Sequence, residues 1–152
     1  VMGDVVREEV VRRGLELTPE NVGRVMLEIR EEGGDAVVAK KCVEKAAEVE
    51  GRRIMIEGIR SLAEVEEFKR HFPNFKLLAT YASPETRFRR IFERGRNDDS
   101  TNRRVFAERD ERELKVGIGS AIAMADHVII NEGTIVEIEM RIRDFLEGYL
   151  RE

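Results

Sequence analysis

Most of the chain shows the spacing of apolar residues that is typical of amphipathic helices. Near its start, the valines at positions 5, 6, 10 and 11 share one helical face, and Gly14 follows them. Two further helices follow start signals, since Thr18 precedes Pro19 and Asp35 precedes another periodic stretch. The first third of the chain is therefore predicted to be helical over residues 4–13, 19–33 and 36–49.

Short apolar runs later in the chain interrupt the helical pattern and predict strands. They cover residues 53–57, 76–82 and 127–130. Helix start signals follow them, namely Ser61 with Glu64, Ser83 with Pro84, and Thr134 with Glu137. Apolar strands that alternate with helices are typical of a parallel sheet with helices on both faces. We predict one α/β domain over residues 1–152, built as a three-layer parallel sheet.

Composition narrows the class of protein. Of the 152 residues, 41% are hydrophobic and 38% charged, yet the net charge is only −4, so no strong attraction to nucleic acid or anionic membranes is expected. One cysteine and two histidines exclude an internal disulfide and a zinc cluster within this chain and favour a cytoplasmic protein. The absence of Gln and the many Glu and Arg residues lean toward a thermophile.

Polar residues stand at the ends of two apolar segments, Val1–Met2 and the run at 53–57. An open parallel sheet binds its ligands beyond the carboxyl ends of its strands. Val1 and Met2 are interpreted as the end of a strand, and Asp4 and Arg7 come one helical turn apart directly after it. Glu57 ends the run at 53–57, and Gly58 and Arg60 come directly after it. These residues are candidates for a site at the carboxyl edge of the sheet.

A stretch rich in arginine extends from Arg87 to Arg112. It holds nine arginines, no lysine and six acidic residues, which gives a local charge of +3 in an acidic chain. The planar guanidinium fork binds two phosphate oxygens at once, so this choice of cation favours a polyphosphate ligand.

Each candidate also has a purely structural interpretation. Asp4 after a glycine could be a helix N-cap, and Glu57 could pair with Arg60 at the end of a strand. The arginine-rich stretch could be a solvated helix face crossed by salt bridges. Taken one at a time, these residues leave both interpretations open.

Together, and in this order, the motifs resemble a known family. The segments "GDVVRE", "IMIEGIR", "RRIFER" and "RNDD", with Arg109 after them, resemble adenylate kinase and related nucleoside monophosphate kinases. The C-terminal segment "ADHVIINEGTIVEIEMRI" resembles dephospho-coenzyme A kinase. Nearly the whole chain is similar to archaeal adenylate-kinase-related proteins of the P-loop nucleotide kinase superfamily, whose substrate is not established.

The resemblance implies roles for the residues on the acceptor side. Asp4 would lie near the transferring phosphoryl group, where it would either hold a water molecule bound to Mg or accept the proton of the acceptor. Glu57 would orient the ligands of the magnesium ion. Arg7 and Arg60, with Gly58, would bind the phosphate of the acceptor. The helices at about 4–50 would form the acceptor-binding part.

The resemblance also implies an arginine cradle in a short lid at about residues 95–104. Its members would be Arg90, Arg94, Arg96 and Arg109, which would neutralise charge on the phosphates during transfer. Phosphoryl transfer depends on such positioning and charge compensation more than on covalent chemistry.

The chain departs from the family in one respect. It contains no G-x-x-x-x-G-K-[ST] loop, which cradles the phosphates of the donor in these kinases. We therefore expect that the first strand, this loop and the first helix precede Val1 in the parent protein, as roughly 25–30 further residues.

The leading hypothesis is an ATP- and Mg-dependent phosphotransferase that acts on a nucleotide or nucleotide-like small molecule. A non-catalytic module that binds or senses nucleotides through Arg7 and Arg60 is the alternative. An RNA-binding accessory is a third possibility, against which the acidic charge and the 6% of aromatic residues count.

Overall fold

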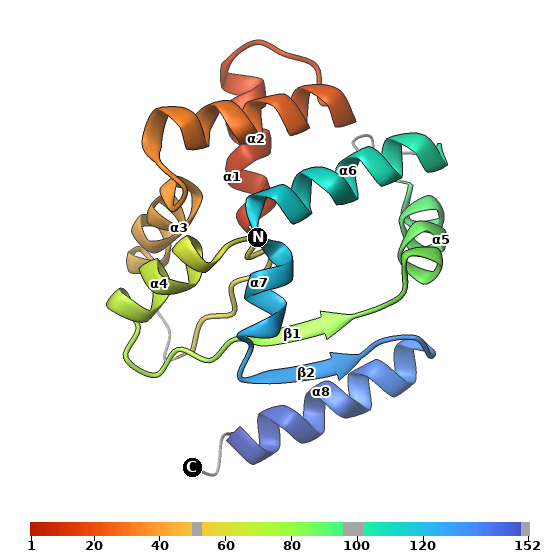
Figure 1. The fold of residues 1–152 in the computed structure, drawn as a ribbon. Coiled ribbons are helices and arrows are strands. Elements are labelled where there is room, and N and C mark those ends of the chain that lie inside the picture. Colours follow the sequence, from red (N-terminus) through yellow and green to blue (C-terminus); the bar gives the residue numbers. More distant parts are fainter. Residues whose placement is uncertain (50–52, 96–101, 150–152) are drawn as a thin grey trace.

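The computed structural model describes residues 1–49, 53–95 and 102–149, and these contain eight helices and two strands (Figure 1). In chain order they are α1 Met2–Arg12, α2 Pro19–Gly33, α3 Val37–Ala47, α4 Leu62–His71, β1 Leu78–Tyr81, α5 Pro84–Arg94, α6 Arg103–Val116, α7 Ile118–Ala123, β2 His127–Ile130 and α8 Ile135–Tyr149.

The two strands form a parallel sheet, as the α/β prediction requires. Leu78 pairs with His127 and Tyr81 with Ile130, and helices α5, α6 and α7 make the crossover between the strands. Asp126 fixes the start of the pair, because its side chain accepts from the Leu77 amide at 2.8 Å and its own amide donates to the Leu77 carbonyl at 2.9 Å. The chain is thus an α/β protein with a parallel sheet.

The strand predicted at residues 53–57 is wrong. This segment has no regular secondary structure, and the side chains of Ile54 and Met55 are 43% and 81% exposed. A strand persists only where its backbone groups pair with a neighbour. No strand among the described residues pairs with this segment, whose contact with α1 is a hydrogen bond from the Met2 amide to the Glu57 carbonyl at 2.8 Å.

Two helix starts differ from the prediction. Helix α1 begins at Met2, so the apolar pair Val1 and Met2 is no strand end, and Asp4 lies in the first turn rather than at the cap. A carboxylate there interacts favourably with the positive end of the helix dipole. Helix α3 begins after Ala36, and no side chain caps it, so the cap predicted at Asp35 is also wrong.

The other predicted caps are confirmed. The side chains of Thr18, Ser61 and Ser83 each accept a hydrogen bond from the backbone amide three residues later. Thr134 and Glu137 form a reciprocal capping box, since the Thr134 amide donates to the Glu137 carboxylate at 2.6 Å and the Glu137 amide to the Thr134 hydroxyl at 3.3 Å.

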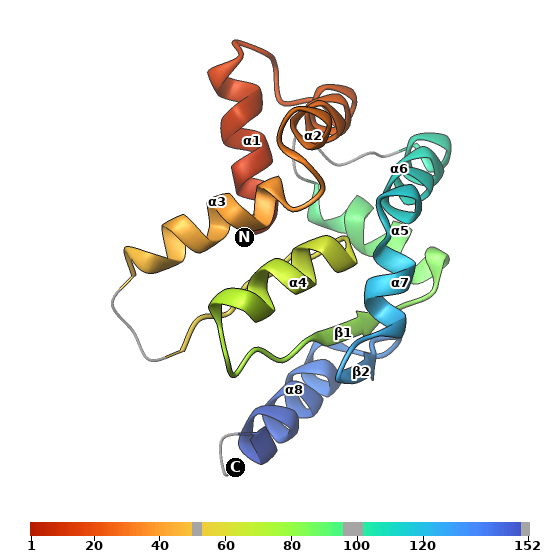
Figure 2. The ribbon, with the colours of Figure 1, turned by 60° about the vertical axis from the view of Figure 1, so that its left-hand side comes forward.

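The main core lies among the first four helices, which Figure 2 shows grouped together. Val10, Val25, Ala39 and Phe68, from α1, α2, α3 and α4 respectively, are fully buried in it. A second, smaller cluster joins Val65 of α4, Leu77 and Ala121 of α7. Helix α8 lies on the side of the strands away from α4 and α7 (Figure 2). None of the helices that the structure describes is long and apolar enough to span a bilayer.

Candidate functional site

The start of α1 and the segment before α4 lie in contact, although more than fifty positions separate them in sequence. Besides the bond from the Met2 amide to the Glu57 carbonyl, a Cβ atom added to Gly58 would lie only 3.4 Å from the Met2 Cβ. Gly58 also has a φ of 103°, a conformation that side chains other than glycine rarely adopt. The φ of Gly58 therefore favours glycine at this position, and the hydrogen bond from Met2 brings the segment that carries Glu57 beside the start of α1.

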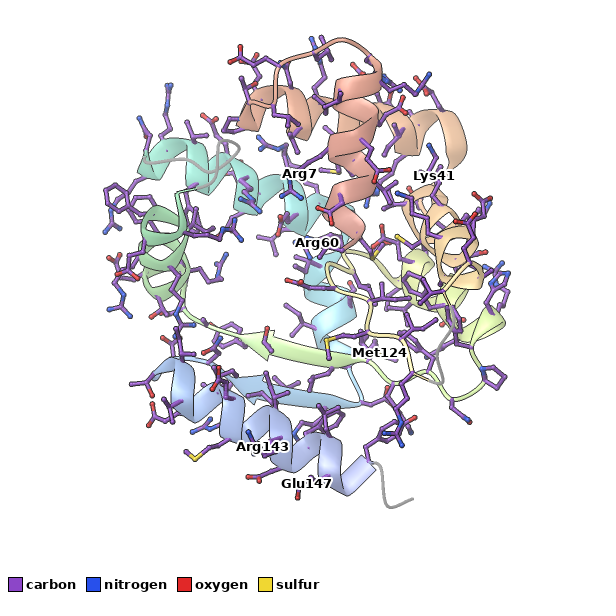
Figure 3. All side chains as sticks on the ribbon, turned by 180° about the vertical axis from the view of Figure 1, so that it is seen from behind. Arg7, Lys41, Arg60, Met124, Arg143 and Glu147 are labelled. Carbon is purple, nitrogen blue, oxygen red and sulfur yellow. The ribbon has the colours of Figure 1, made fainter. Side chains whose placement is uncertain are left out.

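Asp4 and Arg7 face each other on the first turns of α1. Nη1 of Arg7 donates to Oδ1 of Asp4 at 2.9 Å, and the Asp4 side chain is 54% exposed. Both residues line an open surface depression of about 450 Å³ together with Glu8, Val11 and Arg12. Figure 3 labels Arg7, which lies on α1, and Arg60, which lies in the segment before α4. The spacing of Asp4 and Arg7 in the sequence thus corresponds to a contact in the structure.

Arg60 is fixed at both its backbone and its side chain. Its amide donates to Oε2 of Glu64 at 2.6 Å, while Nε lies 3.3 Å from Oε2 of Glu113 on α6. The other oxygen of Glu113 accepts from Nε of Arg109 at 3.4 Å. One carboxylate of α6 therefore contacts an arginine predicted to bind the acceptor and an arginine predicted for the cradle.

Glu64 connects this site to the core. Its carboxylate is fully buried, and Oε1 accepts from Nη2 of Arg30 on α2 at 2.6 Å. The predicted capping box is therefore altered, because the Glu64 side chain bonds the Arg60 amide rather than the Ser61 amide. The backbone at Arg60 is held by a carboxylate that is itself held by a buried arginine.

The predicted cradle is divided between two places. Arg90 donates to the backbone carbonyls of Asn131 at 2.9 Å and Gly133 at 2.7 Å, at the loop between β2 and α8. Arg94 is exposed in the last turn of α5. Arg96 lies outside the described residues, as does most of the lid predicted at 95–104. The C-terminal end of α6 lies beside the segment before α4, since a Cβ atom added to Gly117 would lie 3.8 Å from the Arg60 carbonyl oxygen. There Arg109 shares the Glu113 carboxylate with Arg60.

Several arginines of the rich stretch pair with acidic side chains. Arg87 binds Asp110 through two bonds of 2.5 and 2.7 Å, and this carboxylate raises the pKa of Arg87. Arg103 binds Glu85 in the same way at 2.6 and 2.7 Å, which lowers the pKa of Glu85. Arg87 and Arg103 therefore agree with the structural interpretation, in which salt bridges cross a helix face.

The carboxylates present fit a magnesium ion that is shared with a bound phosphate. In the described ranges, no three His, Cys, Asp or Glu side chains gather as a set that could hold a metal. Asp4 and Glu57 instead offer two exposed carboxylates on adjoining segments, and Mg²⁺ usually takes one or two carboxylates and completes its shell with water and substrate phosphates.

The sequence did not indicate two further residues at this place. Glu113 stands four positions after Arg109, a spacing that predicts their contact on a helix, but nothing in the sequence predicts its contact with Arg60. Arg112 packs on α2, where a Cβ atom added to Gly23 would lie 2.9 Å from Nε of Arg112. A glycine inside a helical pattern is a weak signal of such close packing.

Comparison with known proteins gives the family. Residues 1–107 match a family model described as an AAA domain. A UPF0200 protein of Thermococcus onnurineus is 46% identical over 99% of this chain and 84% of the relative, and one of Methanocaldococcus jannaschii is 47% identical over 98% and 76%. The chain belongs to the UPF0200 family. A UPF0200/UPF0201 protein of Archaeoglobus fulgidus is 44% identical, and the match covers 96% of this chain but 46% of that protein.

The AAA-domain match makes this family related to P-loop NTPases, and the relatives named here are archaeal proteins. The resemblance to an archaeal protein of the P-loop superfamily is thus confirmed at that level.

Proposed function

We propose that this protein is an ATP- and Mg-dependent phosphotransferase that acts on a nucleotide or nucleotide-like acceptor, and that residues 1–60 carry most of its acceptor site. The observation that supports this most directly is the contact between α1 and the segment before α4. It joins the segment before α4, which carries Glu57 and Arg60, to the start of the helix that carries Asp4 and Arg7, and it supports the proposal for a protein related to P-loop NTPases.

In this proposal Arg7 and Arg60 bind the phosphate of the acceptor. Two guanidinium groups can bind phosphate oxygens through paired hydrogen bonds and compensate the negative charge. Asp4 lies beside Arg7, where a carboxylate can accept a proton from the attacking oxygen or orient a water molecule. A bound magnesium ion would supply charge neutralisation of the phosphates, and Asp4 and Glu57 would hold it.

The cradle and the donor complete the proposal. Arg109, Arg94 and Arg96 would compensate charge on the transferring group, whereas Arg90 holds the loop after β2 through its carbonyls. The donor phosphates need a loop of the G-x-x-x-x-G-K-[ST] type, which the 152 residues do not contain. We place the sheet in the three-layer arrangement of nucleoside monophosphate kinases, with β1 and β2 as two of its strands.

A non-catalytic module that binds nucleotides is the second candidate. It is favoured by the pairing of the arginine-rich stretch, because Arg87 and Arg103 are each bound to a carboxylate and Arg90 to backbone carbonyls. Arginines that are committed to such structural contacts would not assist the transfer of a phosphoryl group, even where a nucleotide binds nearby.

The test uses the full-length protein with Mg, γ-labelled ATP and a panel of AMP, GMP, CMP and UMP. A phosphotransferase transfers label to at least one acceptor, and Arg60→Lys weakens acceptor binding by about tenfold because lysine lacks the bidentate fork. Arg70→Lys is the matched control, since Arg70 lies exposed on α4, outside residues 1–60. Binding of a nucleotide without transfer would support the sensing module, and absence of both would reject each proposal.

A further inference from the structure

The guanidinium group of Arg112 differs from those of other partly buried arginines, because it has no partner in the described part of the chain. Arg13, Arg87 and Arg90 are typical of the others, since they bind carboxylates or backbone carbonyls. Neither a hydrogen bond nor an ion pair joins the Arg112 side chain to any described residue, although the residue is only partly exposed. A charge that is partly removed from water and lacks a counter-ion favours the binding of an anion.

The contact with α2 shows how this guanidinium group is turned. A Cβ atom added to the buried Gly23 would lie 2.9 Å from Nε, 3.0 Å from Cζ and 3.0 Å from Nη2 of Arg112. A point almost equally far from these three atoms, at such distances, lies over the face of their plane. The N–H groups of arginine lie in that plane. Helix α2 therefore covers one face of the group, while the donors point outward along its edges.

Donors arranged in this way suit a phosphate group. The planar guanidinium can bind two phosphate oxygens at once through parallel hydrogen bonds. Its packing against α2 restricts the long side chain before a ligand arrives, which lowers the entropy lost on binding. The neighbouring helix also displaces water from one face, so the attraction to an anion is stronger than for a fully hydrated arginine.

Arg112 lies where α6 meets the part of the chain that carries the proposed acceptor site. Gly23 belongs to α2, within residues 1–60. Glu113, the residue after Arg112, places Oε2 at 3.3 Å from Nε of Arg60 in the segment before α4. The same turn of α6 thus contacts two segments of the acceptor side.

We propose that Arg112 is a phosphate-binding residue of the acceptor site, and that Gly23 is the position that lets its guanidinium group lie against α2. This inference rests on the proposed function and adds to it an arginine from α6. Binding forms hydrogen bonds and an ion pair between Arg112 and the phosphate of the acceptor, and no covalent bond changes.

The first measurement follows the Nε–Hε resonance of Arg112 by NMR in the isotope-labelled full-length protein. The probe is the monophosphate among AMP, GMP, CMP and UMP that wild type binds most tightly, and its nucleoside is the comparison without phosphate. We expect the monophosphate to shift the Arg112 resonance and the nucleoside to leave it in place. Arg143 is the internal control, since it lies exposed on α8 and no described residue pairs with it (Figure 3). Its resonance should not move with either compound.

The second measurement is calorimetric titration of variants with the same monophosphate. We expect Arg112→Gln to weaken binding by about tenfold and Arg143→Gln to leave it unchanged. Gly23→Ala should weaken binding in the same direction, because the added methyl group displaces the guanidinium group from α2. Alanine favours a helix more than glycine does, so a weakened helix would not explain this loss. Gly148→Ala is the matched control, since an added Cβ atom there would meet nothing within 4 Å.

The double variant separates a direct from an indirect role of Gly23. Gly23→Ala combined with Arg112→Gln should bind as weakly as Arg112→Gln alone, because no guanidinium group is left to displace. A further loss in the double variant would refute the role of Gly23. An unmoved Arg112 resonance with bound monophosphate, an equal shift with the nucleoside, or unchanged affinity in Arg112→Gln would overturn the inference while the proposed function stands. If wild type bound none of the four monophosphates, the proposed function would fall, and this inference with it.

Discussion

Glu9 is the described carboxylate with the most arginine contacts, and it is 5% exposed. Arg12 donates to it through two nitrogens at 2.8 and 2.6 Å, and Arg13 through Nε at 2.7 Å. Arg13 continues to Glu28 at 2.7 Å and Glu32 at 3.2 Å, so the network joins α1 to α2. The hydrogen bonds from Arg12, and then those from Arg13, lower the pKa of Glu9 from 4.5 to about 2.

Because the pKa of Glu9 is lower in the folded protein, its ionised form stabilises the fold at pH above 4.5, and this contribution is lost as pH falls toward 2. We expect Glu9→Gln to lower the free energy of unfolding by about 1–3 kcal/mol at pH 7, since hydrogen bonds to a charged group are removed. The difference from wild type should shrink between pH 4.5 and 2.

Urea unfolding of both proteins at several pH values measures this difference in free energy. Glu8→Gln, which breaks an exposed pair with Lys45, is the control and should have a much smaller effect. A difference that stays constant down to pH 2 would contradict the assignment.

At this scale the sequence predicted contacts within one helix better than contacts between segments. The spacing of Asp4 and Arg7 indicated that they face each other, and they do. The partners of Arg60 could not be predicted, because Glu113 reaches it from α6 only after the chain has folded. Residues three or four positions apart are neighbours on one helix, so the sequence predicts their contact. Contacts between different elements depend on how those elements pack.

At the scale of elements, capping side chains determine where most helices begin, whereas a strand forms only where a second strand pairs with it. Thr18, Ser61, Ser83 and Thr134 cap helices as predicted, because a cap needs only its own next turn. Residues 53–57 have an apolar pattern suited to a strand, but a strand needs a neighbour, and none of the described segments supplies one.

The pair of Arg30 and Glu64 is a buried polar link between two helices. It joins α2 to α4 at 2.6 Å, with Arg30 8% exposed and Glu64 fully buried. We expect Glu64→Gln to lower the free energy of unfolding by about 3–5 kcal/mol, because Arg30 keeps a buried charge without its counter-ion. Replacing both residues by methionine should cost less than this single change, since no charge remains buried. Unfolding by denaturant of wild type, Glu64→Gln and the double methionine variant measures the three free energies. A double variant less stable than Glu64→Gln would refute this account.

At the scale of the whole molecule, the described residues form two cores of unequal size. The larger one joins the first four helices, and the smaller one consists of Val65, Leu77 and Ala121 with partly buried neighbours. Helix α8 contributes no buried residue to either. Its contacts include the stacking of Phe145 on His127 at 5.0 Å and hydrogen bonds from Tyr149 to the Asn74 carbonyl and from Arg141 to the Ile130 carbonyl. The α/β class could be predicted from the alternation of apolar runs and helical patterns. The unequal size of the two cores could not, because it depends on how the elements pack.

Stability should therefore vary across the molecule. Segments with few buried contacts open locally at a lower free energy than the rest. We expect the amides of α8 to exchange with solvent markedly faster than those of α1 under native conditions, as measured by hydrogen exchange with residue resolution. Phe145→Ala should speed exchange in α8 and β2 and leave α1 unchanged, because it removes a contact between α8 and β2.

Val10→Ala is the matched control for the larger core, since Val10 is fully buried there. It should lower the free energy of global unfolding by about 2 kcal/mol and speed exchange at the slowest amides of α1 and α2. If the amides of α8 exchanged as slowly as those of α1, or if Phe145→Ala speeded exchange equally in both, the molecule would unfold as one cooperative unit. The helical core would then owe part of its stability to the sheet and α8, through contacts such as those of Leu77 and Val65.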